Sequence, residues 1–300
     1  FKTPTLVTDN IYKLGEYLAK TYPNYLFASL IPSTNGSFAI MDTDGEYYKL
    51  SKFISNSITI NTVNNYKQAY EAAYKFAEFT SLLEGFNINE LNYTLTNFHN
   101  LNIRFKEFEK QVELADDFKL NEAKDAINEI YKNKNILNTY ETVVSENILP
   151  IRAIHHDTKI SNILFDEKQN GLCVIDLDTV MPGYYISDVG DMLRTYLCPV
   201  DEEEKDLTKI EIREDLFEAI AEGYFKGMGK TLTVSEKKLF VYAGKFLIYM
   251  QSIRFLTDYL ANDVYYGEKY PGHNLMRTKN QLQLLNKYMQ FSNKFEKIVS

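Results

Sequence analysis

Apolar residues recur at helical spacing along most of the chain. The clearest run lies between Asn64 and Gly85, where the apolar positions are Tyr66, Ala69, Tyr70, Ala73 and Ala77. This period is typical of an amphipathic helix that buries one face. The same spacing predicts further helices at residues 8–20, 96–115, 121–146, 187–197, 211–226, 235–261 and 274–297.

Segments rich in aromatic and β-branched residues occur among the first sixty positions. They span residues 25–33, 37–42 and 46–54, and Asp44-Gly45 between the last two is a hairpin turn sequence. These positions predict a small, mostly antiparallel sheet that follows the first helix. A single further β region is expected at 162–176, inside the otherwise helical remainder of the chain.

Composition narrows the class of protein and of partner. Of the 300 residues 45 % are hydrophobic, no run of about 18 apolar residues could span a membrane, and the first twenty residues contain no secretory signal. The net charge of −8 disfavours a nucleic-acid partner. Cys173 and Cys198 form no CxxC pair, which argues against a disulfide framework or a zinc site. We expect a soluble, cytoplasmic protein that binds a small molecule, with no membrane partner; its oligomeric state is unknown.

The β region at 162–176 is predicted to be a hairpin. Two apolar strands, 162–166 and 172–176, are joined by the sequence EKQNG, in which Asn170-Gly171 suits a turn with positive φ. If Asp166 pairs with Leu172, Asn162 lies opposite Asp176, with Cα atoms roughly 4.5 to 5.5 Å apart. A carboxamide and a carboxylate would then face each other at one end of the hairpin.

Polar side chains before the hairpin enter the same end. Asp157 and Lys159 lie on the loop that leads to Asn162, so both can converge on Asp176, together with Asp178. Two hard oxygen ligands suit Mg²⁺, whose coordination is usually completed by water and substrate phosphates. A second carboxylate can orient a hydroxyl and accept its proton, and a lysine can meet the charge of a transferring phosphoryl group.

The motif H-x-D-x-K-x-x-N, followed nineteen residues after its Asp by the Asp of VIDLD, resembles the catalytic loop and metal-binding Asp of the protein-kinase-like fold. Four stretches, HHDTKISNILFD, CVIDLDTVMPG, SDVGDMLRT and RFLTDYLANDVYY, together resemble the aminoglycoside phosphotransferase and choline kinase superfamily, and within it the N-acetylhexosamine 1-kinases. The likeness extends over most of the chain, from about position 20 to position 290.

This resemblance implies a fold and a lobe boundary. The fold is α+β: a protein-kinase-like two-lobed fold with a partial, truncated N-terminal β lobe at residues 1–60 and a mostly helical C-terminal lobe at 61–300. The C-terminal lobe would carry the catalytic loop and the metal-binding hairpin. Family members carry a glycine-rich phosphate-covering loop at the front, and the first sixty residues contain no Gly-x-Gly. We therefore expect the first part of the N-terminal lobe to be missing from this chain.

The resemblance also implies site residues and cofactors. The cofactors would be ATP and Mg²⁺, and the reaction would phosphorylate the anomeric hydroxyl of an N-acetylhexosamine. Asp157 matches the catalytic base, with Lys159 offsetting phosphoryl charge. The remaining matches are Asn162 and Asp176 to the metal and triphosphate ligands, Lys52, Phe53 and Ile54 to the adenine-framing hinge, and Thr179, Arg254 and Tyr265 to sugar contacts.

Other readings stay open from the residues alone. The acceptor could be an aminoglycoside, choline or another amino alcohol, or another sugar, and a kinase fold without catalysis would be a binding protein. Asp188 suits a helix N-cap, and Arg254 with Asp258 suits a surface ion pair. The sequence GMGKT at 227–231 lacks the first glycine of a phosphate-binding loop and is expected to end a helix.

Overall fold

The computed structural model describes residues 3–300, which fall into two compact units. The first unit combines the chain up to Thr96 with Ile151–Asp188 and Asp215–Thr233, and the second combines Asn97–Pro150, Val189–Glu214 and Val234–Ser300. The lobe boundary expected at residue 60 stays a prediction, and the first two residues of that lobe lie outside the described part.

The first unit begins with helix α1, Pro4–Thr21, which starts four residues earlier than predicted. Its apolar side chains at Val7, Ile11, Leu14 and Leu18 recur every three or four residues and are all buried. The buried face packs against the short 3₁₀ helix η3, Leu177–Thr179, which follows the predicted hairpin. The core of this unit therefore supports the segment that carries the candidate site.

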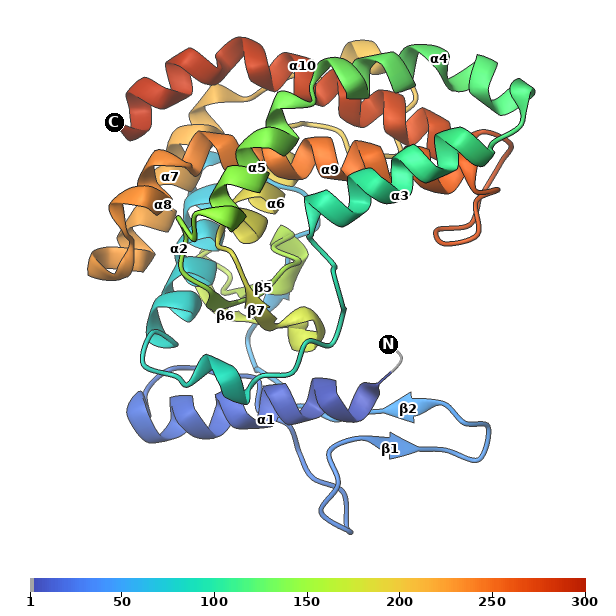
Figure 1. The fold of residues 1–300 in the computed structure, drawn as a ribbon. Coiled ribbons are helices and arrows are strands. Elements are labelled where there is room, and N and C mark those ends of the chain that lie inside the picture. Colours follow the sequence, from blue (N-terminus) through green and yellow to red (C-terminus); the bar gives the residue numbers. More distant parts are fainter. Residues whose placement is uncertain (1–2) are drawn as a thin grey trace. The chain divides into compact units, whose positions relative to one another are not determined.

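The sheet after α1 is smaller than predicted. Strands β1, Ile40–Met41, and β2, Tyr47–Tyr48, form the expected hairpin around Gly45, whose φ is 85° (Figure 1). The segment 25–33 is not a strand, because it contributes only an isolated bridge between Leu30 and Ser51. Ile31 still donates to the Leu50 carbonyl oxygen, but Pro32, the next residue, has no N–H to donate, which ends the pairing.

The predicted hairpin at 162–176 provides two strands of a three-stranded sheet, of which β5 is the central one. Strand β5, Ile163–Phe165, pairs with β6, Gly171–Val174, and on its other side with β3, Ile58–Thr59. Helix α2, Tyr66–Leu82, packs on β6 and confirms the helix predicted from Asn64. Asn65 caps this helix by accepting the backbone N–H of Gln68.

The predicted register of this hairpin was wrong by one residue. The Ile175 N–H donates to the carbonyl oxygen of Asn162 at 2.9 Å, so Asn162 lies opposite Ile175 rather than Asp176. A bulge after Leu164 shifts the pairing, and the Asp166 carboxylate closes the turn by accepting backbone N–H groups. The positive φ falls on Gln169, at 62°, and not on Asn170 or Gly171.

Further elements complete the first unit. A two-stranded sheet pairs β4, Arg152–Ile154, with β7, Met181–Gly183. Helix α7, Glu214–Met228, approaches α2 so closely that a Cβ at Gly223 would lie 2.3 Å from the Tyr70 carbonyl oxygen. The GMGKT segment ends this helix and continues as η5, Gly229–Thr231, which confirms the expected helix end. Two more 3₁₀ turns are η1, Ile88–Glu90, and η2, Ile160–Asn162.

The second unit is helical, and its central helix is α9, Phe240–Leu260 (Figure 1). Four helices pack against α9: α3, Leu101–Leu114; α4, Asp117–Lys132; α5, Asn135–Ser145; and α10, His273–Val299. The remaining elements are α6, Ile186–Tyr196, which belongs to this unit from Val189 on, η4, Leu207–Lys209, and α8, Val234–Lys238. Because α9 has neighbours on several sides, most of its residues are buried.

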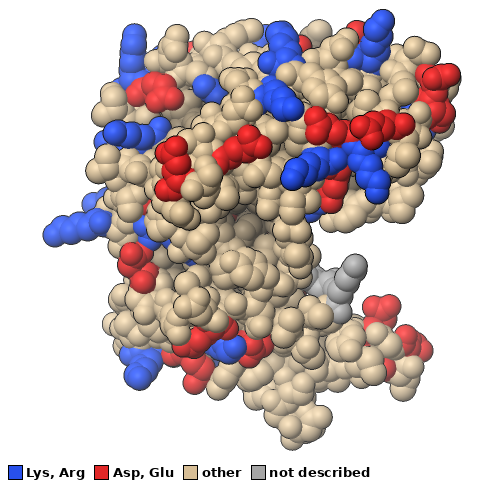
Figure 2. Space-filling model, viewed as in Figure 1, with Lys and Arg blue, Asp and Glu red and all other residues tan. Residues whose placement is uncertain are grey.

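The single helix predicted at 121–146 is two helices. Asn133 ends α4, because its side-chain amide and its backbone N–H both donate to the Glu129 carbonyl oxygen. On the face drawn in Figure 2, acidic and basic side chains lie intermingled. Among residues 3–300, no helix combines the length and the apolar character needed to cross a bilayer.

Candidate active site

Asp157 and Asn162 are brought together by the loop between β4 and β5. The Asn162 amide nitrogen donates to the Asp157 carbonyl oxygen at 2.8 Å and to the Asp157 carboxylate at 3.2 Å. The Lys159 ammonium lies 3.4 Å from the other carboxylate oxygen, and its side chain is exposed. Three of the predicted residues therefore form one group, with the carboxylate held from both sides.

The loop is braced by Asp188, which sequence reasoning assigned to a helix N-cap. Asp188 is instead the third residue of α6 and is buried. Its two carboxylate oxygens accept the backbone N–H groups of His155, at 2.9 Å, and His156, at 2.7 Å. The Thr158 hydroxyl donates to the Asp188 carbonyl oxygen. An acid inside the apolar stretch YYISDVGDML was the available sign that Asp188 has a buried partner.

His155 connects the loop to the strand that leads to Asp176. Its Nδ1 accepts the Asp157 backbone N–H at 3.3 Å, so Nε2 carries the ring proton and donates to the Ile175 carbonyl oxygen at 2.9 Å. The ring packs edge-on against Phe76 of α2. This arrangement agrees with a bracing role and leaves no ring nitrogen for chemistry.

His156 is buried with a left-handed backbone, at a φ of 66°. Burial lowers the pKa of His156 to about 3, so the ring is neutral at physiological pH. Gly183 of β7 makes room for this ring, since a Cβ at position 183 would lie 2.6 Å from Nε2. His156 is therefore a packing residue.

Asp176 leaves the hairpin in a left-handed conformation, with φ and ψ of 55°. The pKa of its carboxyl is raised, first by desolvation of the carboxyl group and then by the negative charges of Asp178 and Asp157. Asp178 pairs with the Lys49 ammonium. No described residue donates a hydrogen bond to the Asp176 carboxylate, so its negative charge is poorly compensated.

The oxygen atoms at this end of the hairpin fit a hard divalent cation. The Asn162 amide nitrogen donates to Asp157. The Asn162 side-chain oxygen accepts no hydrogen bond from a described residue. Among residues 3–300, no three His, Cys, Asp or Glu side chains come close enough to hold a metal by themselves. An ion here would take few protein ligands, Asp176 and the Asn162 oxygen, which suits Mg²⁺.

A cavity of about 430 Å³ lies beside Asp176. Its wall includes Lys52, Phe53 and Ile54, so the structure brings the predicted hinge residues and the predicted metal ligand to one cavity. The Lys52 backbone N–H donates to the Ser29 carbonyl oxygen at 2.9 Å. Among the described residues, the backbone N–H and C=O of Phe53 have no hydrogen-bond partner, and Phe53 is 87 % exposed.

Thr179 lies in the first unit, and its hydroxyl donates to the His155 carbonyl oxygen at 2.6 Å. Its proton is therefore used inside the loop, and only its oxygen can accept a bond from a ligand. Arg254 and Tyr265 lie in the second unit, on the wall of a cavity of about 440 Å³. The Arg254 guanidinium carbon lies 5.9 Å from the centre of the Tyr265 ring.

The surface ion pair between Asp258 and Arg254, the alternative role considered for Arg254, is not formed. Asp258 is buried, and its carboxylate accepts the backbone N–H groups of Tyr265, at 2.8 Å, and Tyr266, at 2.9 Å. Arg254 donates instead to the Gln251 side chain at 3.1 Å. The carboxylate therefore fixes the loop that presents Tyr265, a role that helical spacing alone could not indicate.

The chain resembles solved phosphotransferases over nearly its whole length. An aminoglycoside phosphotransferase from Alicyclobacillus acidocaldarius is 14 % identical, with a TM-score of 0.66 over 99 % of this chain and 84 % of that one. An amicoumacin kinase in complex with AMP-PNP and Ca²⁺ is 10 % identical, with a TM-score of 0.58 over 95 % and 81 %. A choline/ethanolamine kinase family protein from Mesorhizobium loti is 13 % identical, with a TM-score of 0.54 over 97 % and 82 %.

At these identities the likeness establishes the fold, and it confirms the predicted protein-kinase-like class. The family comparison goes further. Residues 58–229, more than half of the chain, match the profile of the phosphotransferase enzyme family. This range contains the loop with Asp157 and Asn162, the hairpin with Asp176, and the helix that carries Asp188. The chain belongs to the phosphotransferase enzyme family of aminoglycoside phosphotransferase type.

Proposed function

We propose that the protein is an ATP- and Mg²⁺-dependent kinase that phosphorylates the anomeric 1-hydroxyl of an N-acetylhexosamine. The observation that carries the kinase part is the Asn162 amide: its nitrogen holds Asp157, and its oxygen, which accepts no hydrogen bond from a described residue, belongs to the residue opposite Ile175, the neighbour of Asp176. This arrangement provides a candidate base and a candidate metal site next to the cavity lined by Lys52, Phe53 and Ile54.

The nucleotide would occupy that cavity. The unpartnered backbone groups of Phe53 offer one donor and one acceptor, which match the hydrogen-bonding edge of adenine. The amicoumacin kinase of the same fold binds AMP-PNP with Ca²⁺, which supports a nucleotide and a divalent cation as ligands. In this chain Asp176 and the Asn162 oxygen would hold Mg²⁺, which neutralises phosphate charge when it is bound.

Asp157 would act on the acceptor hydroxyl. Its carboxylate is held by Asn162 and Lys159 and remains 30 % exposed, so a hydroxyl can reach it. Asp157 orients the sugar hydroxyl and takes its proton, the sugar oxygen forms a bond to the γ-phosphorus, and the bond between that phosphorus and the ADP oxygen breaks. Lys159 offsets the charge on the transferring group. The products are the sugar 1-phosphate and ADP.

The charge around Arg254 supports a neutral acceptor. Two guanidinium groups, Arg104 and Arg254, line the second-unit cavity. Two acids also line this cavity. Glu107 accepts a hydrogen bond from Arg104 at 2.9 Å, and the Asp258 carboxylate accepts backbone N–H groups. A wall of this kind disfavours a cationic aminoglycoside or choline and suits the hydroxyl and amide groups of a sugar. Thr179, Arg254 and Tyr265 are the proposed sugar contacts.

The test is an ADP-release assay with Mg-ATP and five acceptors: N-acetylglucosamine, N-acetylgalactosamine, galactose, choline and kanamycin. We expect acceptor-dependent ADP release with the two N-acetylhexosamines, and mass spectrometry should find a monophosphate that dilute acid hydrolyses at the anomeric carbon. Turnover with choline or kanamycin alone would move the acceptor to an amino alcohol or an aminoglycoside. Nucleotide binding without turnover of any acceptor would favour a binding protein.

A further inference from the structure

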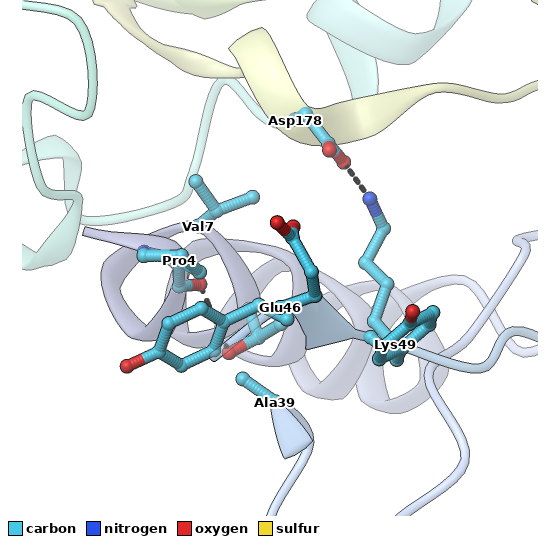
Figure 3. Close-up of a pocket in the computed structure, with 9 residues that line it drawn as sticks. Pro4, Val7, Ala39, Glu46, Lys49 and Asp178 are labelled. Carbon is cyan, nitrogen blue, oxygen red and sulfur yellow. Dashed lines mark hydrogen bonds and ion pairs between the residues drawn. The ribbon is translucent and has the colours of Figure 1, made fainter. Parts of the chain in front are cut away.

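Lys49 and Asp178 form an ion pair that joins the hairpin β1–β2 to η3. Lys49 follows β2 directly, and Asp178 is the middle residue of η3. Figure 3 shows the Lys49 side chain extended toward the Asp178 carboxylate. The side chains are 32 % and 21 % exposed, so solvent and ligands can reach both partners.

Lys49 stands at the border of two cavities. It lines the proposed nucleotide cavity together with Asp176, and it also lines a second cavity of about 230 Å³ together with Asp178 and Glu46. In Figure 3 the Glu46 carboxylate points into this second space. The Lys49 ammonium is therefore a cation placed among acids at the edge of the proposed nucleotide cavity.

The acids of the proposed metal site need positive charge when no cation is bound. Desolvation, and then the negative charges of Asp178 and Asp157, raise the pKa of the Asp176 carboxyl, so three carboxylates share this region. Two lysines compensate part of this charge, because Lys159 faces Asp157 and Lys49 faces Asp178. A divalent cation at Asp176 would supply the same positive charge. The Lys49 ammonium would then no longer be needed to neutralise Asp178.

We propose that Lys49 is a phosphate-binding residue that Asp178 retains until nucleotide arrives. The inference rests on the proposed function. Lysine suits this exchange because its ammonium is a point charge on a flexible stem, without the fixed geometry that a bidentate partner would impose. Without nucleotide, Lys49 neutralises Asp178. With Mg-nucleotide bound, the cation compensates the acids and the ammonium turns to the phosphates.

An ordinary ion pair that only fastens β2 to η3 predicts different behaviour. In that case, loss of Lys49 would lower the melting temperature without changing the affinity for nucleotide. The two explanations separate most clearly with nucleotide in the absence of metal. Under that condition the phosphates compete with Asp178 directly for the Lys49 ammonium, and no divalent cation contributes to binding.

The experiment is calorimetric titration of AMP-PNP in EDTA into the whole chain and its variants, repeated with Mg²⁺. Without metal, Lys49→Met should weaken AMP-PNP binding about tenfold, the value of one charged hydrogen bond. Asp178→Asn should strengthen it severalfold, because the ammonium is released. The double variant should bind like Lys49→Met. Lys13→Met is the matched control, because it breaks the Asp9 pair on α1 at a similar exposure of 33 %.

Each result of these titrations either supports the role of Lys49 or overturns it. If the gain from Asp178→Asn persists when Lys49 is Met, removal of a negative charge explains it and the inference is overturned. Unchanged binding in Lys49→Met also overturns it, and if Lys49→Met does not fold, absence of a gain in Asp178→Asn does the same. A wild-type chain that binds no AMP-PNP with or without Mg²⁺ overturns the proposed function, and the inference with it.

Discussion

The Asp188 carboxylate accepts the backbone N–H of His156 at 2.7 Å, thirty-two residues away along the chain. The second oxygen accepts the N–H of His155, the adjacent residue. Two consecutive backbone donors are therefore fixed by one buried side chain, immediately before Asp157. The position of the proposed base depends on a residue that contacts neither proposed substrate.

Replacing Asp188 with Asn should loosen this loop. The amide has one acceptor oxygen, so one buried N–H loses its partner, which costs about 1 to 3 kcal/mol of unfolding free energy. Turnover should fall at least about tenfold, because Asp157 is no longer held in place. Urea unfolding and ADP release measure the two effects. Asp206→Asn makes the same chemical change at an exposed acid and should alter neither; wild-type stability in Asp188→Asn would contradict the bracing role.

Asp176 and Asp157 should respond differently to the same substitution. Asp176→Asn removes a charge from the proposed metal site, so binding of Mg-AMP-PNP should weaken along with turnover. Asp157→Asn should leave that binding nearly intact and lower kcat by about 10²- to 10⁴-fold, the range for a positioned general base. Calorimetry and an ADP-release assay measure both quantities. Equal losses of nucleotide affinity would reject this division of roles, and full activity in either variant would reject the kinase proposal.

Arg254→Ala should raise the acceptor KM far more than the ATP KM. The guanidinium lies 5.1 Å from the Phe98 ring centre and 5.5 Å from that of Tyr266, so it also orders the aromatic wall. Arg254→Lys keeps the charge and loses the planar group, and it should fall between the wild type and the Ala variant. Initial rates against sugar and against ATP distinguish the two constants. An acceptor KM unchanged in the folded Ala variant would return Arg254 to a packing role.

His156 should make the fold less stable in acid. Burial lowers its pKa from the ordinary 6.5 to about 3, so between these values the unfolded chain binds a proton that the folded chain does not. Unfolding free energy should therefore fall as pH falls through this window, by at most about 1.4 kcal/mol per pH unit for one group. In His156→Asn, which tolerates a positive φ, the slope should be shallower by one proton. Parallel slopes in urea unfolding at pH 7.5, 6 and 5 would show that His156 does not titrate in this way.

Local patterns predicted most of the helices and the contact between Asp157 and Asn162. The run from Tyr66 to Leu82 buries one face, so its period is visible in the sequence, and α2 lies where it was expected. Asp157 and Asn162 are five residues apart on one loop, and their contact needs no distant segment. The turn at Gly45 is also local, because glycine is suited to its positive φ.

Features that depend on contacts between distant parts of the chain could not be predicted from local patterns. The hairpin register follows from the bulge after Leu164 and from the Asp166 side chain, neither of which hydrophobic alternation reports. The partners of Asp188 and Asp258 are backbone groups, which have no sequence signature. Pairing of β3 with β5 joins segments about a hundred residues apart, and two-residue strands are too short to show a period.

The fit between Gly183 and His156 constrains the order in which the two positions can change. A methyl group at 183 would meet the imidazole ring at 2.6 Å, so no larger residue is tolerated there while the histidine is present. The ring must become smaller first, and the Ile154 side chain, whose Cδ1 would lie 2.8 Å from the same methyl group, must also shift before the second change can fill the space. Related sequences should therefore show a histidine at 156 together with a glycine at 183, and a larger residue at 183 only beside a smaller one at 156. A larger residue at 183 is harmful while the histidine at 156 is present, and it is tolerated once the residue at 156 is smaller.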